Sequence, residues 1–266
     1  MIKLEKVFDI LMEAIFPSNI YCIVCGSMID SSRMYSLCDD CIHKIHWIST
    51  QRTCIKCGKE IRQGSLCYDC AGGSHLFERG FSCMTYGLHE RDILMDIKYH
   101  SKGYMAVKMG DVMFDRMYSA GIIKGLGGET ADSVEIDMVV PVPVSRKRLI
   151  KRGYNQSEIM AKRFVKRWRE FGGEIICDSK LLYRTRETAM LRSLNPADRE
   201  RALKGAFEVR EKARESLLGR NVLLIDDIYT TGATADACSR ALLEGGAKKV
   251  YLLTLAIGGN RRPSEA

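Results

Sequence analysis

The spacing of the cysteines near the beginning of the chain constrains its fold more than any other feature. Eight of the eleven cysteines form four Cys-x-x-Cys pairs before residue 71, namely Cys22 and Cys25, Cys38 and Cys41, Cys54 and Cys57, and Cys67 and Cys70. Two thiolates separated by two residues can bind one ion from adjacent corners, and four thiolates complete a zinc tetrahedron that leaves no position for water. No secretory signal accompanies the pairs, so metal binding is favoured over a disulfide framework.

The placement of glycines divides the pairs into two sets. Gly26 and Gly58 directly follow the first and third pairs, and the other two pairs lack a glycine there. A glycine at this position lets the backbone turn around a metal and direct amide hydrogens at sulfur. We therefore expect two structural zinc sites, formed by the first two pairs and by the last two, although a cross-braced pairing stays open. With few large apolar side chains in so short a module, the metals would form its core.

Beyond the cysteine pairs, short apolar runs alternate with helical patterns, which predicts an α/β domain with a mostly parallel sheet. Predicted strands cover 81–86, 138–142, 222–226 and 250–256, and predicted helices cover 91–118, 156–171 and 234–244.

Gly72 and Gly73 interrupt these patterns, and we place a domain boundary there. Residues 1–74 would hold an amphipathic helix over 1–16 and the cysteine module, and residues 75–266 would form the α/β domain. No run approaches the roughly 20 apolar residues of a membrane span. We therefore expect no membrane insertion and a cytoplasmic location.

One strand, loop and helix near the C-terminus carry the groups that a sugar phosphate requires. Residues 221–240 read NVLLIDDIYTTGATADACSR, in which an apolar strand ends in Asp226 and Asp227. Ligands of open α/β sheets bind at the carboxyl ends of strands, where these carboxylates can accept hydrogen bonds from sugar hydroxyls. The loop that follows supplies hydroxyls and backbone amides at a helix N-terminus, which favours an anion. We therefore expect a pocket for a ribose 5-phosphate, with a phosphate loop formed by Thr230, Thr231, Gly232, Ala233 and Thr234.

Two motifs give the chain a family resemblance. LLIDDIYTTGAT resembles the phosphoribosyl pyrophosphate signature of type I phosphoribosyltransferases. Together with the cysteine pairs, the stretch around Lys98, and VPVPVSRKRLIKRGYNQ at 140–156, it resembles the bacterial ComF family of competence proteins. The resemblance covers nearly the whole chain. It implies a type I phosphoribosyltransferase-like parallel sheet, flanked by helices and preceded by a double zinc ribbon.

The resemblance also implies roles for individual residues. Asp226 and Asp227 would hold the ribose hydroxyls, the phosphate loop would bind the 5-phosphate, and the segment after Val140 would bind pyrophosphate beside Mg²⁺. Arg148 and Arg152 are placed near that pyrophosphate, because arginine makes bidentate contacts with phosphate oxygens. No catalytic residue is assigned. Family members carry a Gln near Leu191 and an Asn near Ala202, and both positions are apolar here, so the acceptor side differs.

The positive charge of the chain is concentrated in one segment. Residues 145–170 hold ten basic and two acidic side chains. Their excess of positive charge equals the net charge of +8 of the whole chain. The helix predicted after Gln156 places Lys162, Lys166 and Arg169, with Arg163 and Arg167, outside an apolar face. Basic surfaces attract nucleic-acid phosphates. We therefore consider three functions. The first is a competence factor that binds phosphoribosyl pyrophosphate and handles single-stranded DNA with a DNA-uptake helicase or other competence proteins. The others are a working phosphoribosyltransferase for a base or amine, and a nucleotide-sensing regulator without transfer activity.

Overall fold

A computed structural model of the chain describes residues 19–49, 52–73, 75–99, 102–128, 130–186 and 196–258. The helix predicted over 1–16 lies outside these residues. The chain divides into two compact units, Met1–Ile45 and His46–Ala266. The first unit contains the first two cysteine pairs, and the second unit contains the last two pairs together with the α/β sheet.

Short turns held by backbone hydrogen bonds organise the first unit. The Cys22 amide donates to the Ser27 carbonyl (2.8 Å), and the Gly26 amide donates to the Cys22 carbonyl (2.9 Å). Gly26 has a φ of 74°, which suits glycine, so the residue predicted to turn the backbone does so. The 3-10 helix η1 (Met34–Ser36) precedes helix α2 (Asp39–Lys44), and Cys38 is the N-cap of α2.

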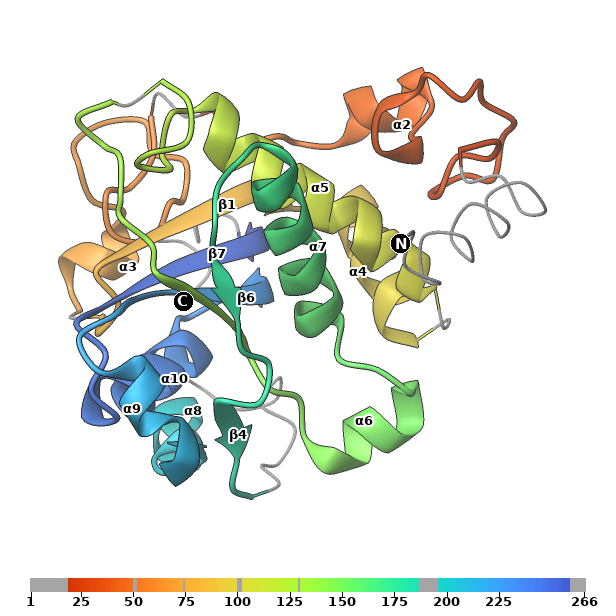
Figure 1. Cartoon of the computed structure of the whole chain (residues 1–266). Coiled ribbons are helices and arrows are strands. Elements are labelled where there is room, and N and C mark those ends of the chain that lie inside the picture. The colour runs from red at the N-terminus through yellow and green to blue at the C-terminus, as the bar shows by residue number, and fades with distance from the viewer. Residues whose placement is uncertain are drawn as a thin grey trace. The chain divides into compact units, whose positions relative to one another are not determined.

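A five-stranded parallel sheet forms the centre of the second unit, with strand order β1-β7-β6-β2-β3 (Figure 1). Its strands are β1 (Arg79–Tyr86), β2 (Met138–Pro141), β3 (Ile176–Cys177), β6 (Asn221–Tyr229) and β7 (Lys249–Gly258). A separate antiparallel hairpin pairs β4 (Leu182–Arg184) with β5 (Phe207–Val209). The central strands β6 and β7 are buried along nearly their whole length, as expected for a parallel sheet covered on both faces.

The helices of the second unit lie before and between these strands in the sequence. They are α3 (Tyr68–Ala71), α4 (Leu88–Tyr99), α5 (Gly103–Ser119), α6 (Arg146–Arg152), α7 (Gln156–Glu170), α8 (Pro196–Leu203), η3 (Glu211–Ala213), α9 (Arg214–Leu217) and α10 (Ala233–Glu244). Among the described residues, no helix has both the length and the apolar character required to cross a bilayer.

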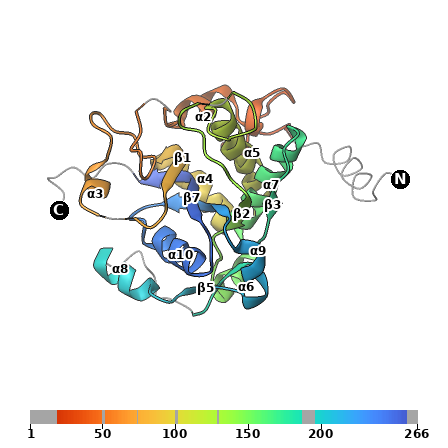
Figure 2. The same ribbon diagram turned by 60° about the vertical axis from the view of Figure 1, so that its left-hand side comes forward.

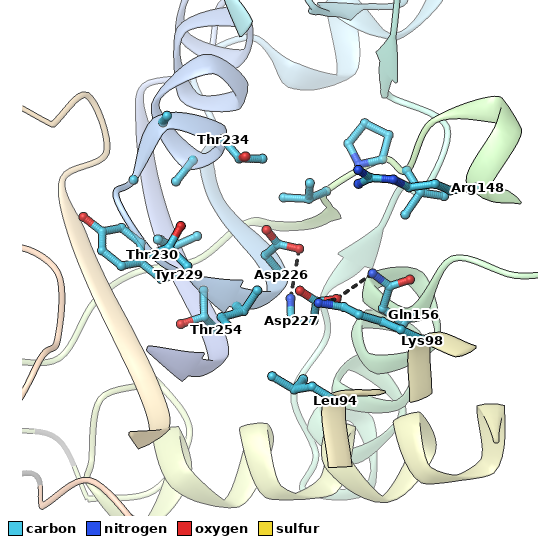
Figure 3. Close-up of a pocket in the computed structure, with 18 of the residues that line it drawn as sticks. Leu94, Lys98, Arg148, Gln156, Asp226, Asp227, Tyr229, Thr230, Thr234 and Thr254 are labelled. Carbon is cyan, nitrogen blue, oxygen red and sulfur yellow. Dashed lines mark hydrogen bonds and ion pairs between the residues drawn. The ribbon is translucent and has the colours of Figure 1, made fainter. Parts of the chain in front are cut away.

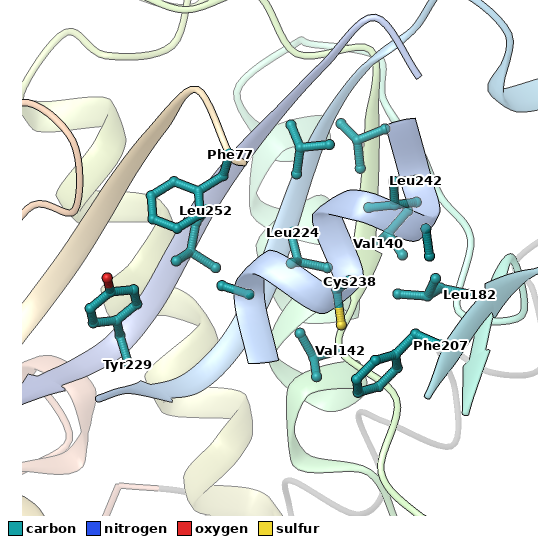
Figure 4. Packing of buried hydrophobic residues seen from close by; sticks show 14 of the residues in the cluster. Phe77, Val140, Val142, Leu182, Phe207, Leu224, Tyr229, Cys238, Leu242 and Leu252 are labelled. Atoms are coloured by element: carbon teal, nitrogen blue, oxygen red, sulfur yellow. The ribbon is translucent and has the colours of Figure 1, made fainter. Parts of the chain in front are cut away.

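Alternating side chains of the central strands serve two buried layers. Val140, Leu224 and Leu252 pack with α10 in one cluster (Figure 4). Their chain neighbours Val139 and Leu223 are equally buried, and because side chains alternate along a strand they point to the opposite face. Helices α5 and α7 contact the sheet there (Figure 2). The predicted α/β class with a parallel sheet flanked by helices is therefore confirmed.

The structure corrects the predicted element boundaries at two places. The strand predicted over 222–226 extends to Tyr229, so the two aspartates lie within β6 and the turn begins only at Thr230. The helix predicted over 91–118 is two helices, α4 and α5, and Lys102 between them has a non-helical backbone (φ −87°, ψ 54°). Apolar residues recur at helical spacing on both sides of this break, which is why periodicity did not reveal it.

The second cysteine set is part of the core of the α/β unit. Its four cysteines are buried in the same cluster as Phe77, Tyr229 and α10. The Gly80 amide of β1 donates to the Lys56 carbonyl (2.6 Å), and a Cβ on Gly58 would lie 2.7 Å from the Gly80 oxygen. Glycine is therefore required where the metal-binding turn meets the first strand. This set lies in the same compact unit as the sheet. The domain boundary predicted near residue 74 stays a prediction.

Candidate functional site

A cavity of about 400 Å³ opens at the carboxyl ends of the sheet strands (Figure 3). Its wall is built from the end of β6 and the loop into α10, the segment after β2, and helix α4. Nine of the lining residues are those assigned to ligand binding from the sequence, namely Asp226, Asp227, Thr230, Thr231, Gly232, Ala233, Thr234, Arg148 and Arg152. Residues up to 86 positions apart in the chain are thus brought around one space of small-ligand size.

Asp226 accepts hydrogen bonds from two protein groups. The Ser157 hydroxyl donates to its Oδ1 (3.1 Å), and the Asp227 amide donates to the same oxygen (2.9 Å). Burial, followed by the negative charge of neighbouring Asp227, raises the pKa of Asp226 to about 7. Burial thus favours the protonated form of this carboxyl, whereas a nearby hydroxyl donor or cation would favour its charged form.

Asp227 is buried and is held by a lysine and an amide that sequence reasoning did not assign to the site. Lys98 Nζ lies 2.9 Å from Asp227 Oδ2, and Gln156 Nε2 donates to the same oxygen (2.6 Å). Arg152 Nη1 in turn donates to Gln156 Oε1 (2.8 Å) and lies over the ring of Tyr99. Helices α4, α6 and α7 are thereby connected to the carboxylate of β6.

The signals for Lys98 and Gln156 were present in the sequence but were weak. In the sequence, Lys98 and Gln156 stand out only as members of the two stretches that resemble the ComF family. Lys98 lies one helical turn after the buried Leu94, which places it beside the apolar face of α4. A lysine at the edge of a buried helix face needs a partner, and that partner is visible only once β6 is folded beside α4.

Within the phosphate loop, Gly232 directly precedes helix α10. Gly232 is the N-cap of α10 with a φ of +83°, and as a glycine it offers no side chain to accept from the first-turn amides. Those amides and the helix dipole therefore remain suited to an external anion. The helix predicted to begin at Thr234 begins at Ala233, directly after Gly232, and the phosphate cradle stays a prediction.

Replacement of Gly232 by alanine is expected to lower the free energy of unfolding by about 2 to 4 kcal/mol, combining a left-handed backbone with overpacking. A Cβ there would lie 2.6 Å from His75 Cε1 and 2.8 Å from the Tyr229 hydroxyl oxygen. Gly219 provides a matched control, because its φ is +72° and a Cβ added there would meet nothing within 4 Å. Urea denaturation of both variants checks this, and equal losses would show that the close contacts at Gly232 carry no cost.

The two arginines assigned to pyrophosphate, Arg148 and Arg152, both belong to helix α6. Ser145 caps α6 by accepting from the Arg148 amide (3.4 Å), and Gly153 ends it in the left-handed conformation (φ 80°). Arg184 of β4 also lines the cavity, with its guanidinium over the Phe207 ring (5.3 Å). Three guanidinium groups therefore line the cavity, and they carry the charge that a second anionic group would need.

Helix α7 has fewer exposed cations than its sequence predicted. Arg163 Nε donates to Asp111 Oδ1 (2.6 Å), and Arg167 Nη2 donates to Asp115 Oδ1 (3.1 Å). Both arginines were predicted on the outer surface, but acidic side chains on α5 draw them into the α5–α7 contact. The exposed cations of α7 are Lys162, Lys166 and Arg169.

The cysteines gather as the sequence predicted, in two sequential sets. Within each set the four sulfur atoms lie within 4.8 Å of one another. A tetrahedral zinc with Zn–S bonds of about 2.3 Å has sulfur–sulfur edges of about 3.8 Å, and the distances from Cys25 to Cys38 (3.7 Å) and from Cys57 to Cys67 (3.6 Å) match. Both sets thus fit a structural zinc. The first set includes the exposed Cys25, whereas all members of the second are buried.

The chain thus combines a parallel α/β sheet that carries a DDxxTTGAT loop at its carboxyl edge with two four-cysteine clusters. Comparison with known families agrees for the cysteine region, because residues 11–71 match the family described as Double zinc ribbon domain. The structural zinc expected from the cysteine pattern is supported by this match and by both clusters.

Named relatives confirm the resemblance to ComF proteins. The chain is 34% identical over 121 residues to DNA utilization protein YhgH of Escherichia coli, covering 45% of this chain and 48% of that protein. It is 30% identical over 120 residues to Competence protein F of Haemophilus influenzae, covering 45% and 50%. The match thus spans about half the length of these relatives. Competence protein ComFC of Bacillus subtilis is 24% identical over 250 residues, covering 86% of this chain and 90% of that protein.

Solved phosphoribosyltransferases superpose on part of the chain. A glutamine phosphoribosylpyrophosphate amidotransferase from B. subtilis, complexed with ADP and GMP, aligns with a TM-score of 0.37 and 17% identity, covering 60% of this chain and 30% of that one. A hypoxanthine phosphoribosyltransferase from Staphylococcus aureus aligns with a TM-score of 0.31 and 14% identity, covering 63% and 69%.

Proposed function

We propose that the chain binds phosphoribosyl pyrophosphate together with Mg²⁺ in the cavity at the end of β6, and that it acts in DNA uptake. The observation that carries the proposal is the convergence of two adjacent carboxylates, a glycine-capped phosphate loop and two arginines around one cavity. A ligand that fits this order of groups has a diol, a phosphomonoester and a second anionic group, as phosphoribosyl pyrophosphate does.

The ribose and the 5-phosphate have separate partners in this arrangement. The Asp226 and Asp227 carboxylates would accept hydrogen bonds from the ribose hydroxyls, which favours the charged form of Asp226. The amides after Gly232 and the threonine hydroxyls would donate to the 5-phosphate. Lys98 and Gln156 both engage Asp227 Oδ2, so a ribose hydroxyl that binds this oxygen must share or replace one of these contacts.

The residues also fit a magnesium ion that is bound with the ligand. Mg²⁺ prefers oxygen ligands and takes most of them from substrate phosphates and water, with one or two carboxylates from the protein. Asp226 and Asp227 are the aspartates among the described residues that line the cavity. Arg148 and Arg152 would bear the remaining negative charge of the pyrophosphate and orient it. Bound Mg²⁺ would neutralise charge on the pyrophosphate.

Calorimetric titration with phosphoribosyl pyrophosphate, in the presence and absence of Mg²⁺, tests the proposal. Saturable binding that strengthens with Mg²⁺, and competition by ribose 5-phosphate, is the expected result. Absence of binding by a folded, zinc-loaded protein would contradict it. Pyrophosphate release with a panel of bases and amines then separates a working transferase from a protein that only binds the donor, such as a competence factor or a nucleotide-sensing regulator.

The proposed role in DNA uptake is supported by the names of the relatives, which refer to DNA utilization and competence. We include single-stranded DNA, a DNA-uptake helicase or other competence proteins as partners, and a cytoplasmic location. The exposed basic side chains of α6 and α7 belong to the most positive segment of the chain and are the surface proposed for DNA.

Neutralising Lys162, Lys166 and Arg169 together is expected to weaken single-stranded DNA binding and to leave phosphoribosyl pyrophosphate binding unchanged. Each phosphate contact contributes about 0.7 to the slope of log affinity against log salt, so three lost contacts should flatten the slope by about two. Fluorescence anisotropy across a salt series measures this. An unchanged slope in the triple variant would assign DNA binding to another surface.

A further inference from the structure

His75 lies directly behind the phosphate loop, and its ring is connected to both ends of that loop. Its Nδ1 lies 2.8 Å from Asp236 Oδ2, in the first turn of α10, and its Nε2 lies 3.0 Å from the hydroxyl oxygen of Tyr229, at the end of β6. The His75 side chain is only 10% exposed. Three segments that are distant in sequence therefore meet at one imidazole.

The hydrogen-bond roles at this imidazole are fixed by the chemistry of its partners. An ionised carboxylate can only accept, so His75 Nδ1 carries a hydrogen and donates to Asp236, and Nε2 exchanges a hydrogen bond with the Tyr229 hydroxyl. The other oxygen of Asp236 accepts from the Leu76 amide (2.8 Å). One carboxylate thus holds the side chain of His75 and the backbone of the next residue.

Gly232 of the phosphate loop packs closely against His75. The missing Cβ of Gly232 would lie 2.6 Å from His75 Cε1, so the loop backbone contacts the ring itself. On its other side the ring stacks on Phe77, with centroids 5.0 Å apart and planes inclined by 16°. Phe77 is fully buried in the cluster that contains the second cysteine set, and its ring meets Tyr229 edge-on (Figure 4).

His75 does not itself face the ligand cavity. Tyr229 and Gly232, which both contact His75, are among the described residues that line the cavity. His75 is not among them. Any influence of the imidazole on a ligand must therefore pass through the loop that it supports. An apolar ring of similar size would fill the same space, so the two polar contacts are the part of His75 that packing does not require.

We propose that His75 is a positioning residue that holds the phosphate loop in its anion-binding conformation, and that it thereby links the second cysteine cluster to ligand affinity. This inference rests on the proposed function of the cavity. Asp236 fixes the first turn of α10, Tyr229 fixes the end of β6, and the stack on Phe77 ties both to the chain that leaves the cluster. A loop already held in place costs less entropy to order when phosphate binds.

Three substitutions separate the polar contacts from the packing. His75→Phe keeps a ring to stack on Phe77 but cannot bond to Asp236 or Tyr229, His75→Gln keeps polar atoms without the ring, and Tyr229→Phe removes one hydroxyl. His89→Phe, at an exposed histidine of α4, is the matched control. Two quantities are measured, namely the affinity for phosphoribosyl pyrophosphate and ribose 5-phosphate by calorimetry, and hydrogen exchange of the amides of residues 230–236. Zinc content and melting temperature are followed in parallel.

We expect His75→Phe to weaken both ligands by about 10-fold, the scale of one or two hydrogen bonds, and to speed exchange of the loop amides. His75→Gln should recover part of both, Tyr229→Phe should show a smaller loss, and His89→Phe should match the wild type. Unchanged affinity and exchange in folded, zinc-loaded His75→Phe would overturn the proposal. If that variant fails to fold, Tyr229→Phe decides, and unchanged exchange there overturns it. If the wild type binds neither ligand, the proposed function fails, and loop exchange alone decides the role of His75.

Discussion

Replacing Cys57 by serine is expected to destabilise the α/β unit by about 5 kcal/mol, because a structural zinc contributes roughly 10 kcal/mol or more to folding and three thiolates retain only part of it. Cys57 is 1% exposed and belongs to the buried cluster that also contains Tyr229 and α10. For a unit of this size the melting temperature should fall by roughly 10 to 20 °C. Scanning calorimetry with zinc in slight excess measures the change.

Cys25→Ser is the matched control for this prediction. Cys25 belongs to the first cysteine set, in the other compact unit, and is exposed. The main transition of the α/β unit should therefore change little, although metal analysis should show one zinc per chain in place of the two expected for the wild type. A Cys25→Ser variant that retains both ions would show that the assignment of ligands to sets is wrong. Equal destabilisation by both substitutions would show that the second set has no special relation to the core.

Replacing both Asp226 and Asp227 by asparagine is expected to weaken phosphoribosyl pyrophosphate binding by at least about 100-fold, since charged hydrogen bonds contribute roughly 1.5 to 3 kcal/mol each. Asparagine keeps an oxygen to accept from Ser157 and from the Asp227 amide, so the fold should survive. Asp92→Asn, at an exposed carboxylate of α4 that does not line the cavity, is the control. Calorimetric affinities within a few-fold of one another in a folded double variant would remove these carboxylates from the site.

The single variant Asp226→Asn should also change how stability depends on pH. The pKa of Asp226 is raised from 3.8 in the unfolded chain to about 7 in the folded protein, by burial and by Asp227. The folded state therefore keeps its proton while the unfolded state releases one, and stability falls as pH rises from about 4 to about 7. Asp226→Asn should remove this loss, with a gain on the order of 2 kcal/mol at pH 8 and little change at pH 4. Chemical denaturation at both pH values measures it, and a gain of equal size at pH 4 would contradict the assignment to ionisation.

The features that the sequence predicted correctly are those encoded over short distances. Cysteine pairs with an adjacent glycine specify a metal-binding turn within a few residues, and both four-cysteine sets gather as expected. The strand, loop and helix around Gly232 are likewise local, because an apolar run, two carboxylates and a helix start follow one another directly. These segments needed no knowledge of the rest of the fold.

The features that were missed depend on contacts between distant segments. Lys98 and Asp227 are 129 positions apart in the numbering, and their 2.9 Å ion pair appears only when α4 packs beside β6. Arg163 and Arg167 resemble surface cations in a helical pattern, since the acidic side chains that bind them lie on another helix, α5. Of the two apolar positions predicted on the acceptor side, Leu191 lies outside the described residues, and Ala202 is half-buried in α8.

A crystal structure of the chain with phosphoribosyl pyrophosphate and Mg²⁺ tests the central claim most directly. The claim predicts the 5-phosphate within hydrogen-bond distance of the amides that follow Gly232, the ribose hydroxyls at Asp226 and Asp227, and the pyrophosphate toward Arg148 and Arg152. It further predicts that the contact of Lys98 with Asp227 is shared with the ligand or exchanged for it. A ligand bound elsewhere, or an empty cavity in crystals grown at a concentration that saturates binding in solution, would contradict it.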